Sequence, residues 1–358
     1  MNGLELMLSG WAILAVPMPG MLLSTSLLSK GNWPMTARRL RILLFAALAF
    51  CAGPLSSAQV VEYTEAPGWP DPATSVAGTP ASWNFGQVSG VATSANGYIV
   101  VLHRGANPLM LFDPGGRFVR AWGGGLFSNG KVAGIAPADR VRGRSGYTAV
   151  YGAPGCYACG AHAVRVDSDN NIWVVDAPGH VVYKMNFQGH VLMELGSKGV
   201  AGQSQNAFNL PTDVAFGSDG SVYVSDGYGN ARVVKYTAEG RYLLEWGNRG
   251  TGSGEFGLPH NLAVDSEDRV YVTDRDNQRV QVFDSEGRFL SEWMDIGGNS
   301  ALFMTVDQHL WTGGTLRDLA GKEIARLLGG NGGHGMTVSA NGEVFVAQLA
   351  GHVQKFVQ

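Results

Sequence analysis

Alternation of apolar and polar residues is the strongest pattern in this chain. The runs IWVVD, VYVSD and VYVTD end at Asp176, Asp226 and Asp274, and each belongs to a stretch with three such alternating runs. Turn sequences such as S-D-G, S-E-D and E-G-R separate the runs. Short alternating runs between such turns predict antiparallel strands joined by tight turns.

These stretches are copies of one unit. The clearest copies begin at residues 162, 212 and 260, and fainter copies begin near residues 89, 302 and 334. A strand-rich period of about 40 to 50 residues is typical of a β-propeller. The copies therefore predict an all-β, six-bladed β-propeller.

The two ends of the repeat array predict how the ring closes. The last copy stops after its third strand, and QVVEYTEA near residue 60 has no other copy to join. We expect residues 60–63 to supply the missing outer strand, which removes exposed sheet edges. One domain, 59–358, then contains all blades, and a glycine-rich insertion at about 124–158 is expected to form a loop on one face.

The copies resemble NHL repeats, in which a turn pattern from glycine to aspartate and an apolar third strand recur. Asp176, Asp226 and Asp274 end equivalent strands. Aspartate side chains in such positions favour hydrogen bonds to nearby backbone. We expect these three carboxylates to hold neighbouring loops.

Histidine recurs at one position of the repeat. Alternate copies carry His162, His260 and His334 five residues before the first strand ends, and the remaining copies carry Ser89, Thr212 and Leu302. Alternate units of a six-fold ring are a third of a turn apart, so these imidazoles should converge on the central axis. Three imidazoles with one open position are what catalytic zinc prefers.

Other interpretations of these histidines remain open. Each could bond backbone separately at a strand start, or His162 could join Cys156 and Cys159 in a different zinc site. Histidines outside this repeat position are expected to be ordinary surface or turn residues; they are His103, His180, His190, His309 and His352.

Strand direction adds three residues to the predicted site. The second strand of each unit returns to the face where the first begins, so residues just past it should share a mouth with the histidines. Arg104, Tyr228 and Arg275 occupy these places. An arginine can bind a carboxylate through two hydrogen bonds, and a tyrosine facing a cation can act as a base.

Composition and charge narrow the class of partner. The chain has 358 residues, 45% of them hydrophobic, with 51 glycines and 15 prolines, which favours an all-β domain with many turns. A formal net charge of −3 gives no electrostatic basis for binding nucleic acid or an anionic membrane surface. A monomer is expected.

The N-terminal region predicts export. Residues 35–58 have a basic start, an apolar run and a small-residue end, the layout of a secretory signal peptide. We expect cleavage after Ala58, Met35 as the true start, and a secreted or periplasmic protein. The apolar stretch upstream of Met35 leaves an N-terminal membrane anchor as an alternative.

Cys156 and Cys159 would be the cysteines of the mature protein. Their C-x-x-C spacing in an oxidising compartment predicts a local disulfide. Covalent haem attachment would need histidine directly after the second cysteine, where Gly160 stands, so haem is excluded.

Several strings together resemble the catalytic core of peptidyl-α-hydroxyglycine α-amidating lyase, a six-bladed NHL propeller. They are GQVSGVA, VVLHRG, the stretch around VSDGYGNARVVKY, LPHNLAVD and VTDRDNQRVQVF, within residues 86–358. The resemblance implies zinc on His162, His260 and His334. It also implies Tyr228 as base, with Arg104 and Arg275 beside a small-molecule or peptide substrate ending in α-hydroxyglycine. The implied products are an amide and glyoxylate.

The chain also departs from that family. The family's structural calcium uses an aspartate after the third histidine, where Gly335 stands here, which counts against calcium. The family's disulfide beside the tyrosine is missing because Gly229 follows Tyr228, and we expect no fused copper-binding hydroxylase domain. The alternatives are a non-catalytic NHL propeller that binds, scaffolds or senses in the cell envelope, and a lactonase-like hydrolase. Such hydrolases usually use carboxylate-rich calcium sites.

Overall fold

The computed structural model describes residues 60–71, 85–128, 141–142, 148–149, 160–294, 296 and 301–358. Contacts divide the chain into two compact units, Met1–Ser57 and Ala58–Gln358, and the second holds every described residue. The predicted leader and Cys156–Cys159 disulfide lie outside the described residues. In the described part of the chain, none of the helices is long and apolar enough to span a membrane.

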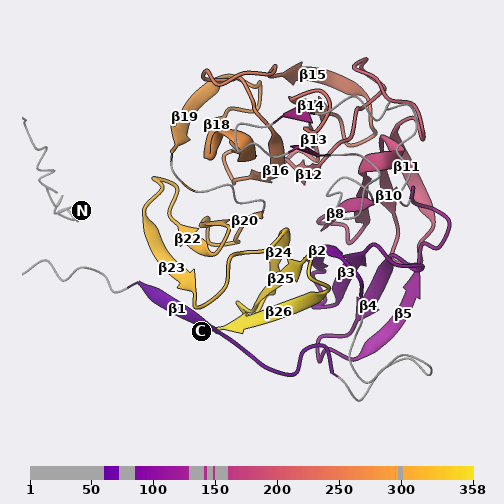
Figure 1. Cartoon of the computed structure of the whole chain (residues 1–358), viewed down its shortest axis with the longest axis vertical. Helices are drawn as coiled ribbons and strands as arrows, with labels where there is room; N and C mark the ends of the chain where they lie inside the picture. The colour runs from indigo at the N-terminus through magenta and orange to yellow at the C-terminus, as the bar shows by residue number, and fades with distance from the viewer. Residues whose placement is uncertain are drawn as a thin grey trace, which may run out of the picture. The chain divides into compact units, whose positions relative to one another are not determined.

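Four antiparallel sheets of four consecutive strands each account for most of the repeats (Figure 1). The polar turns of the sequence separate the strands, as the alternation predicts. The sheets are β2 (Val88–Thr93), β3 (Ile99–His103), β4 (Leu109–Phe112) and β5 (Phe118–Trp122); β8 (Ala161–Val166), β9 (Ile172–Asp176), β10 (Val181–Met185) and β11 (Val191–Gly196); β12 (Asp213–Phe216), β13 (Val222–Asp226), β14 (Arg232–Tyr236) and β15 (Tyr242–Trp246); and β16 (Pro259–Val264), β17 (Val270–Asp274), β18 (Arg279–Phe283) and β19 (Phe289–Trp293).

The remaining repeat strands form one eight-stranded sheet in the order β20-β21-β22-β23-β1-β26-β25-β24. Its members are β1 (Val61–Glu65), β20 (Leu302–Met304), β21 (Leu310–Thr312), β22 (Thr315–Arg317), β23 (Glu323–Leu327), β24 (Gly335–Val338), β25 (Val344–Gln348) and β26 (His352–Val357).

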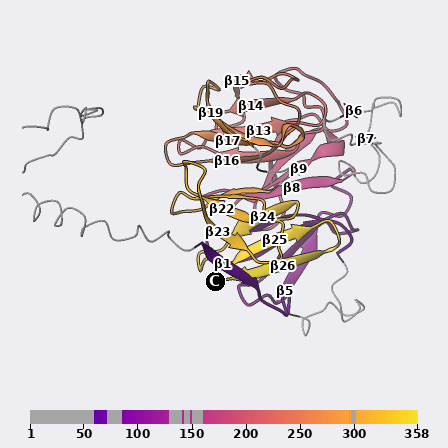
Figure 2. The same cartoon turned by 60° about the vertical axis from the view of Figure 1, so that its left-hand side comes forward.

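Strand β1 joins the N-terminal end of this unit to its C-terminal end, as Figures 1 and 2 show. It pairs antiparallel with β26 at Thr64↔Val357, which confirms the predicted closing strand. It also pairs in parallel with β23 at Val61↔Ala325, a contact that the sequence analysis did not predict. Because β1 merges two repeat units into one sheet, the six-blade count stays a prediction, while the predicted all-β propeller class is confirmed.

The first strands of the repeats surround the centre of the unit (Figure 1). They contact one another in the order β2, β8, β12, β16, β20 and β24, and β24 contacts β2. Residues at the start of these strands therefore face a common axis, which is the arrangement that the histidine pattern requires.

Hydrophobic side chains fill the spaces between neighbouring sheets. Second and third strands such as β17 and β18 are buried along their whole length, whereas the fourth strand β19 is partly exposed. Glycines in the turns before the fourth strands allow close packing across sheets. A Cβ on Gly287 would lie 2.6 Å from the Trp246 ring, and one on Gly189 would lie 2.8 Å from the Trp122 ring. Burying such aromatic rings stabilises the fold by about 25 cal/mol per Å² of apolar surface.

Among the described residues, two short helices and a two-stranded sheet lie outside the sheets of the repeats. The 3₁₀ helices η2 (Ala177–Gly179) and η3 (Arg275–Asn277) follow the second strands β9 and β17. Within the predicted insertion, β6 (Val141–Arg142) pairs with β7 (Thr148–Ala149), and most of the insertion lies outside the described residues.

Candidate metal centre

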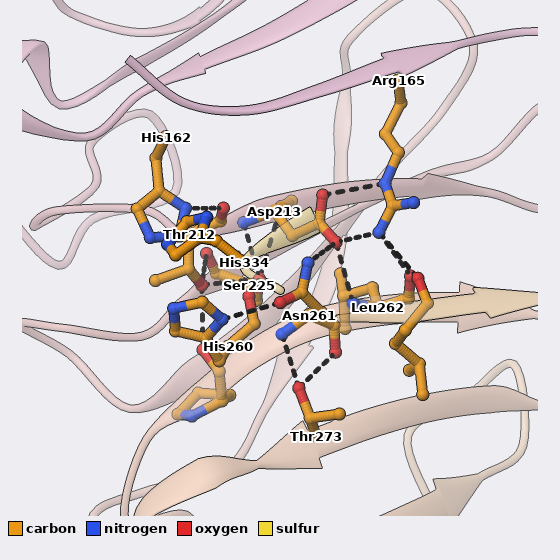
Figure 3. Close-up of polar contacts among 12 residues, drawn as sticks. His162, Arg165, Thr212, Asp213, Ser225, His260, Asn261, Leu262, Thr273 and His334 are labelled. Atoms are coloured by element: carbon orange, nitrogen blue, oxygen red, sulfur yellow. Dashed lines mark hydrogen bonds and ion pairs between the residues drawn. The ribbon is translucent and has the colours of Figure 1, made fainter. Parts of the chain in front are cut away.

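His162, His260 and His334 meet at the centre of the ring of first strands (Figure 3). Their ring centroids are 4.8 Å apart for His162 and His260, 4.5 Å for His162 and His334, and 5.2 Å for His260 and His334. One nitrogen of each lies within 4.8 Å of the others. All three side chains are buried. A search of the described histidines, cysteines and carboxylates for groups that could hold a metal ion finds these three histidines.

Irregular pairing at the strand starts directs two of these rings inward. The register between β8 and β9 shifts between Ala161 and Ala163, where His162 lies. The register between β16 and β17 shifts between Pro259 and Leu262, where His260 lies. A bulge re-aims a side chain that regular alternation would send elsewhere.

Each histidine has its Nδ1 atom next to an oxygen acceptor. Thr212 O lies 2.5 Å from His162 Nδ1, Ser89 O lies 2.7 Å from His334 Nδ1, and Asn261 Oδ1 lies 2.7 Å from His260 Nδ1. These oxygens only accept hydrogen bonds, so each Nδ1 carries the proton and each Nε2 keeps its lone pair. Such contacts orient metal-binding histidines in proteins.

Burial keeps the imidazoles of His162 and His334 neutral. Burial lowers the pKa of His162 well below its usual value, and the neighbouring histidines lower that pKa further. Burial likewise lowers the pKa of His334 to about 3, helped by the charge of Arg104. Metals bind neutral imidazole, so these shifts favour metal binding at neutral pH.

The buried Nε2 atom of His334 shows whether the site suits a cation, because its hydrogen-bonding state is known. It has no hydrogen-bond partner among the described residues. A buried, unpaired acceptor is costly unless a ligand satisfies it. The donor set of three buried Nε2 atoms, one of them unsatisfied, therefore fits a metal ion such as zinc.

Tyr228 lies beside the same nitrogens. Its hydroxyl is 3.0 Å from His162 Nε2 and 3.2 Å from His260 Nε2, and the side chain is buried. Gly227 brings the tyrosine loop close to the next repeat, because a Cβ there would lie 2.0 Å from Pro259 O. Arg249, which the sequence analysis missed, donates to the Tyr228 carbonyl at 3.4 Å.

The two predicted arginines approach Tyr228. The Arg275 guanidinium carbon lies 5.7 Å from the centre of the Tyr228 ring. Arg104 Nη1 donates to Gln87 Oε1 at 2.8 Å, and burial lowers the pKa of Arg104 while Tyr228 raises it. The structure thus brings Arg104, Tyr228 and Arg275 to the histidine cluster, and their roles stay predictions.

The residues near Gly335 do not fit a calcium ion. Gly335 has no side-chain oxygen, and Asp213 lines a cavity of about 10 Å³ with Gly335 and His334. The Asp213 carboxylate is already paired with Arg165 at 2.5 Å. Calcium prefers several free oxygen ligands, which these side chains do not offer.

Asn261, Asp213 and Arg165 form a polar group behind His260 that the sequence analysis also missed (Figure 3). Asn261 Nδ2 donates to Asp213 Oδ2 at 2.8 Å. A signal was available, because Arg165 interrupts an apolar first strand and Asp213 begins another. Such charges inside a ring of apolar strands need partners.

The histidines at other repeat positions do not join the cluster. His180 forms a turn, as expected, and accepts a hydrogen bond from Leu210 N at 3.1 Å. His103 and His180 are nevertheless buried, so the expectation of ordinary surface or turn positions was wrong for His103. Its ring nitrogens contact Phe85 O at 2.6 Å and Asn107 O at 2.9 Å, which explains its burial.

The strand-end aspartates hold backbone, as predicted. Asp176 accepts from Ser128 N at 2.8 Å, Asp226 from Asn209 N at 2.8 Å, and Asp274 from Gly257 N at 2.8 Å. They fix the loops that precede or follow the inner strands.

Comparison with known proteins agrees with this architecture. The NHL repeat family matches residues 208–236 and 256–283. The chain is 35% identical over 206 residues to peptidylglycine alpha-amidating monooxygenase of Rattus norvegicus, covering 55% of this chain and 20% of that protein. It is 33% identical over 207 residues to a probable peptidyl-alpha-hydroxyglycine alpha-amidating lyase of Caenorhabditis elegans, covering 56% of each. The chain thus spans about half or less of these relatives' length.

Solved structures share the fold at low identity. A streptogramin B lyase matches with a TM-score of 0.51 and 15% identity, covering 78% of this chain and 95% of that one. A putative gluconolactonase matches with a TM-score of 0.52 and 11% identity, covering 77% and 89%. The chain therefore carries NHL repeats on a propeller fold and has homologues named peptidyl-alpha-hydroxyglycine alpha-amidating lyase.

Proposed function

We propose that this chain is an exported, zinc-dependent lyase that cleaves the N–C bond of an α-hydroxyglycine-type carbinolamide to an amide and glyoxylate. The observation that carries the proposal is the position of the Tyr228 hydroxyl, 3.0 Å and 3.2 Å from two of the three clustered Nε2 atoms. A base and a set of metal donors therefore face one point. The relatives named as peptidyl-alpha-hydroxyglycine alpha-amidating lyases support this reaction class. The layout of residues 35–58 supports export.

The reaction moves one proton from oxygen to nitrogen. His162, His260 and His334 would hold a zinc ion through their Nε2 atoms, and that ion would supply Lewis acidity that lowers the pKa of a nearby substrate hydroxyl. Tyr228 is placed to take the hydroxyl proton as the general base. An electron pair of the deprotonated oxygen then forms the C=O bond of glyoxylate, the C–N bond breaks with its electrons going to nitrogen, and the amide nitrogen takes up the proton from Tyr228.

Arg104 and Arg275 suit the carboxylate that leaves with glyoxylate. Arg275 lies over the ring of Tyr228, Arg104 interacts electrostatically with Tyr228, and guanidinium groups bind carboxylates through paired, charge-assisted hydrogen bonds. Holding the carboxylate would place the neighbouring hydroxyl at the metal donors and Tyr228. Substrates that lack the carboxylate should therefore bind poorly.

The decisive experiment combines metal analysis with product analysis. The purified chain is incubated with N-benzoyl-α-hydroxyglycine, and glyoxylate and benzamide are quantified together. We expect equal amounts of both products, loss of turnover after chelation, and recovery with zinc. Bound zinc without glyoxylate would reject the lyase function and keep the metal centre. A protein that purifies without metal and behaves the same after His260→Ala would favour the non-catalytic propeller instead.

A further inference from the structure

The three histidines are not held alike. His162 bonds the carbonyl of Thr212, and His334 bonds the carbonyl of Ser89, each at the equivalent position of the next repeat around the ring. If His260 followed the same pattern, its Nδ1 would donate to the carbonyl of Leu302, which occupies the equivalent position in the next repeat. That carbonyl instead accepts from Arg165 Nη2 at 3.1 Å, and His260 Nδ1 lies 2.7 Å from Asn261 Oδ1.

The side-chain amide of Asn261 can point in only one direction. Its Nδ2 donates to Asp213 Oδ2 at 2.8 Å, which leaves Oδ1 facing His260. The reverse orientation would set the amide oxygen against a carboxylate oxygen and an N–H group against the ring. Since Asn261 is buried, water cannot relieve that conflict.

Asp213 is itself fixed by partners from other strands. Arg165 Nε lies 3.1 Å from Asp213 Oδ1, and Arg165 Nη2 lies 2.5 Å from Asp213 Oδ2. The backbone N–H of Leu262 adds a third donor at 3.1 Å. Asp213 is completely buried, so its carboxylate depends on these donors. Figure 3 shows the chain of contacts from Arg165 to His260.

We propose that Asn261, oriented by Asp213 and Arg165, is a positioning residue that holds His260 in the tautomer with its proton on Nδ1 and thereby sets metal affinity. The proposal rests on the metal centre of the proposed function. His162 and His334 obtain the same tautomer from backbone carbonyls, which no substitution removes. His260 alone of the three obtains it from a replaceable side chain, so Asn261 is the point where sequence tunes the site.

The first experiment examines the tautomer without any metal or substrate. Long-range ¹H–¹⁵N spectra of the histidine-labelled, metal-free protein distinguish protonated Nδ1 from protonated Nε2. We expect His260 protonated on Nδ1 in the parent chain and a mixture of both tautomers in Asn261→Leu, which keeps the volume and loses the acceptor. Unchanged His260 signals in Asn261→Leu would overturn the proposal, whatever the enzyme activity proves to be.

The second experiment measures zinc affinity by competition with a chelator. Loss of an outer contact to a metal-binding histidine weakens affinity by about 10- to 100-fold, which is the change expected for Asn261→Leu. Asn277→Leu is the matched control, because buried Asn277 also donates to a buried aspartate, Asp274, at 2.7 Å in the same repeat. It should lower stability while zinc affinity stays within about twofold. Equal losses in both variants would overturn the positioning role.

A third variant separates positioning from folding. Asn261→Asp keeps an oxygen facing His260, and a proton shared between the introduced carboxylate and that of Asp213 would replace the lost N–H donor. We expect this variant to keep the Nδ1–H tautomer and to bind zinc more tightly than Asn261→Leu. The opposite order would contradict the proposal even if Asn261→Leu folds poorly.

Discussion

The repeats β8–β11 and β16–β19 each supply a histidine to the centre, yet they support it differently. His162 is followed by Ala163 and bonds the backbone of the next repeat, whereas His260 is followed by Asn261 and bonds that side chain. A backbone acceptor is part of the fold itself. A side-chain acceptor can change by one substitution without disturbing the strand. The same repeat position thus carries one histidine whose hydrogen-bond acceptor is fixed by the backbone and one whose acceptor can be changed by substitution.

The same two repeats differ at their strand-end aspartates. Asp274 pairs with Arg279 across β17 and β18, and Arg279 Nε donates to Asp274 Oδ2 at 2.9 Å. Asp176 faces Val181 in the equivalent register. Asp176 Oδ1 has no hydrogen-bond partner among the described residues, and burial raises the pKa of Asp176 to about 6. The same loop contact is therefore built once with a paired charge and once without.

Removing either ligand should have the largest effect and should erase the difference between the repeats. His162→Ala and His260→Ala each delete one of three metal donors, so bound zinc should be lost. Glyoxylate release should fall by at least about 10³-fold, since metal chemistry contributes several kcal/mol to the barrier. Elemental analysis and product assays measure both. His190→Ala, at an exposed turn of the β8–β11 repeat, is the control. Full activity of His162→Ala or His260→Ala without bound metal would contradict the metal centre.

Tyr228 bridges the two repeats, because its hydroxyl contacts both His162 and His260. Tyr228→Phe should lower kcat by about 10²–10⁴-fold, the usual contribution of a general base, while zinc stays bound. Tyr242→Phe, on the outer strand of the same sheet, should leave turnover unchanged. Wild-type kcat in Tyr228→Phe would exclude the tyrosine as base and leave the metal centre intact.

Breaking the ion pair between Arg279 and Asp274 should lower the free energy of unfolding more than a change at the equivalent position of the β8–β11 repeat. Arg279→Met leaves Asp274 buried without its cation, and losing one partner of a buried ion pair costs about 3–5 kcal/mol. Val181→Ala removes buried methyl groups from the other repeat and should cost about 2 kcal/mol. Urea unfolding of both variants measures the two losses. A smaller loss for Arg279→Met than for Val181→Ala would mean that the ion pair adds little.

The parts of this molecule that repeat could be predicted from the sequence. Histidine on alternate copies placed three ligands on one axis, and strand direction placed Tyr228 with them. The contact between Asn261 and Asp213 could not be predicted, because it joins residues that are 48 positions apart and occurs in one repeat only. The pairing of β1 with β23 was also beyond prediction, because a parallel contact between strands far apart in the sequence leaves no local pattern.

The smallest effect should appear in the pH dependence of stability. The pKa of Asp176 rises from 3.8 to about 6 on folding, so between these values the folded state binds more protons than the unfolded state. Stability therefore falls as pH rises through this window, and above it the loss is complete, on the order of 2–3 kcal/mol. Asp176→Asn removes this loss and keeps an oxygen that can accept from Ser128 N. The stability of the variant relative to the parent chain should therefore increase as pH rises.

Urea midpoints between about pH 4 and pH 8 measure this difference. Burial also raises the pKa of Asp226 to about 6, and Asp226 is present in both proteins. Its contribution to the pH dependence of stability therefore remains, and Asp176→Asn should flatten the plot of stability against pH only in part. Asp169→Asn, at an exposed turn of the same repeat, should leave the curve unchanged. Parallel curves for the parent chain and Asp176→Asn would show that burying the Asp176 carboxylate has no electrostatic effect on stability. The two repeats would then differ only in how they hold their histidines.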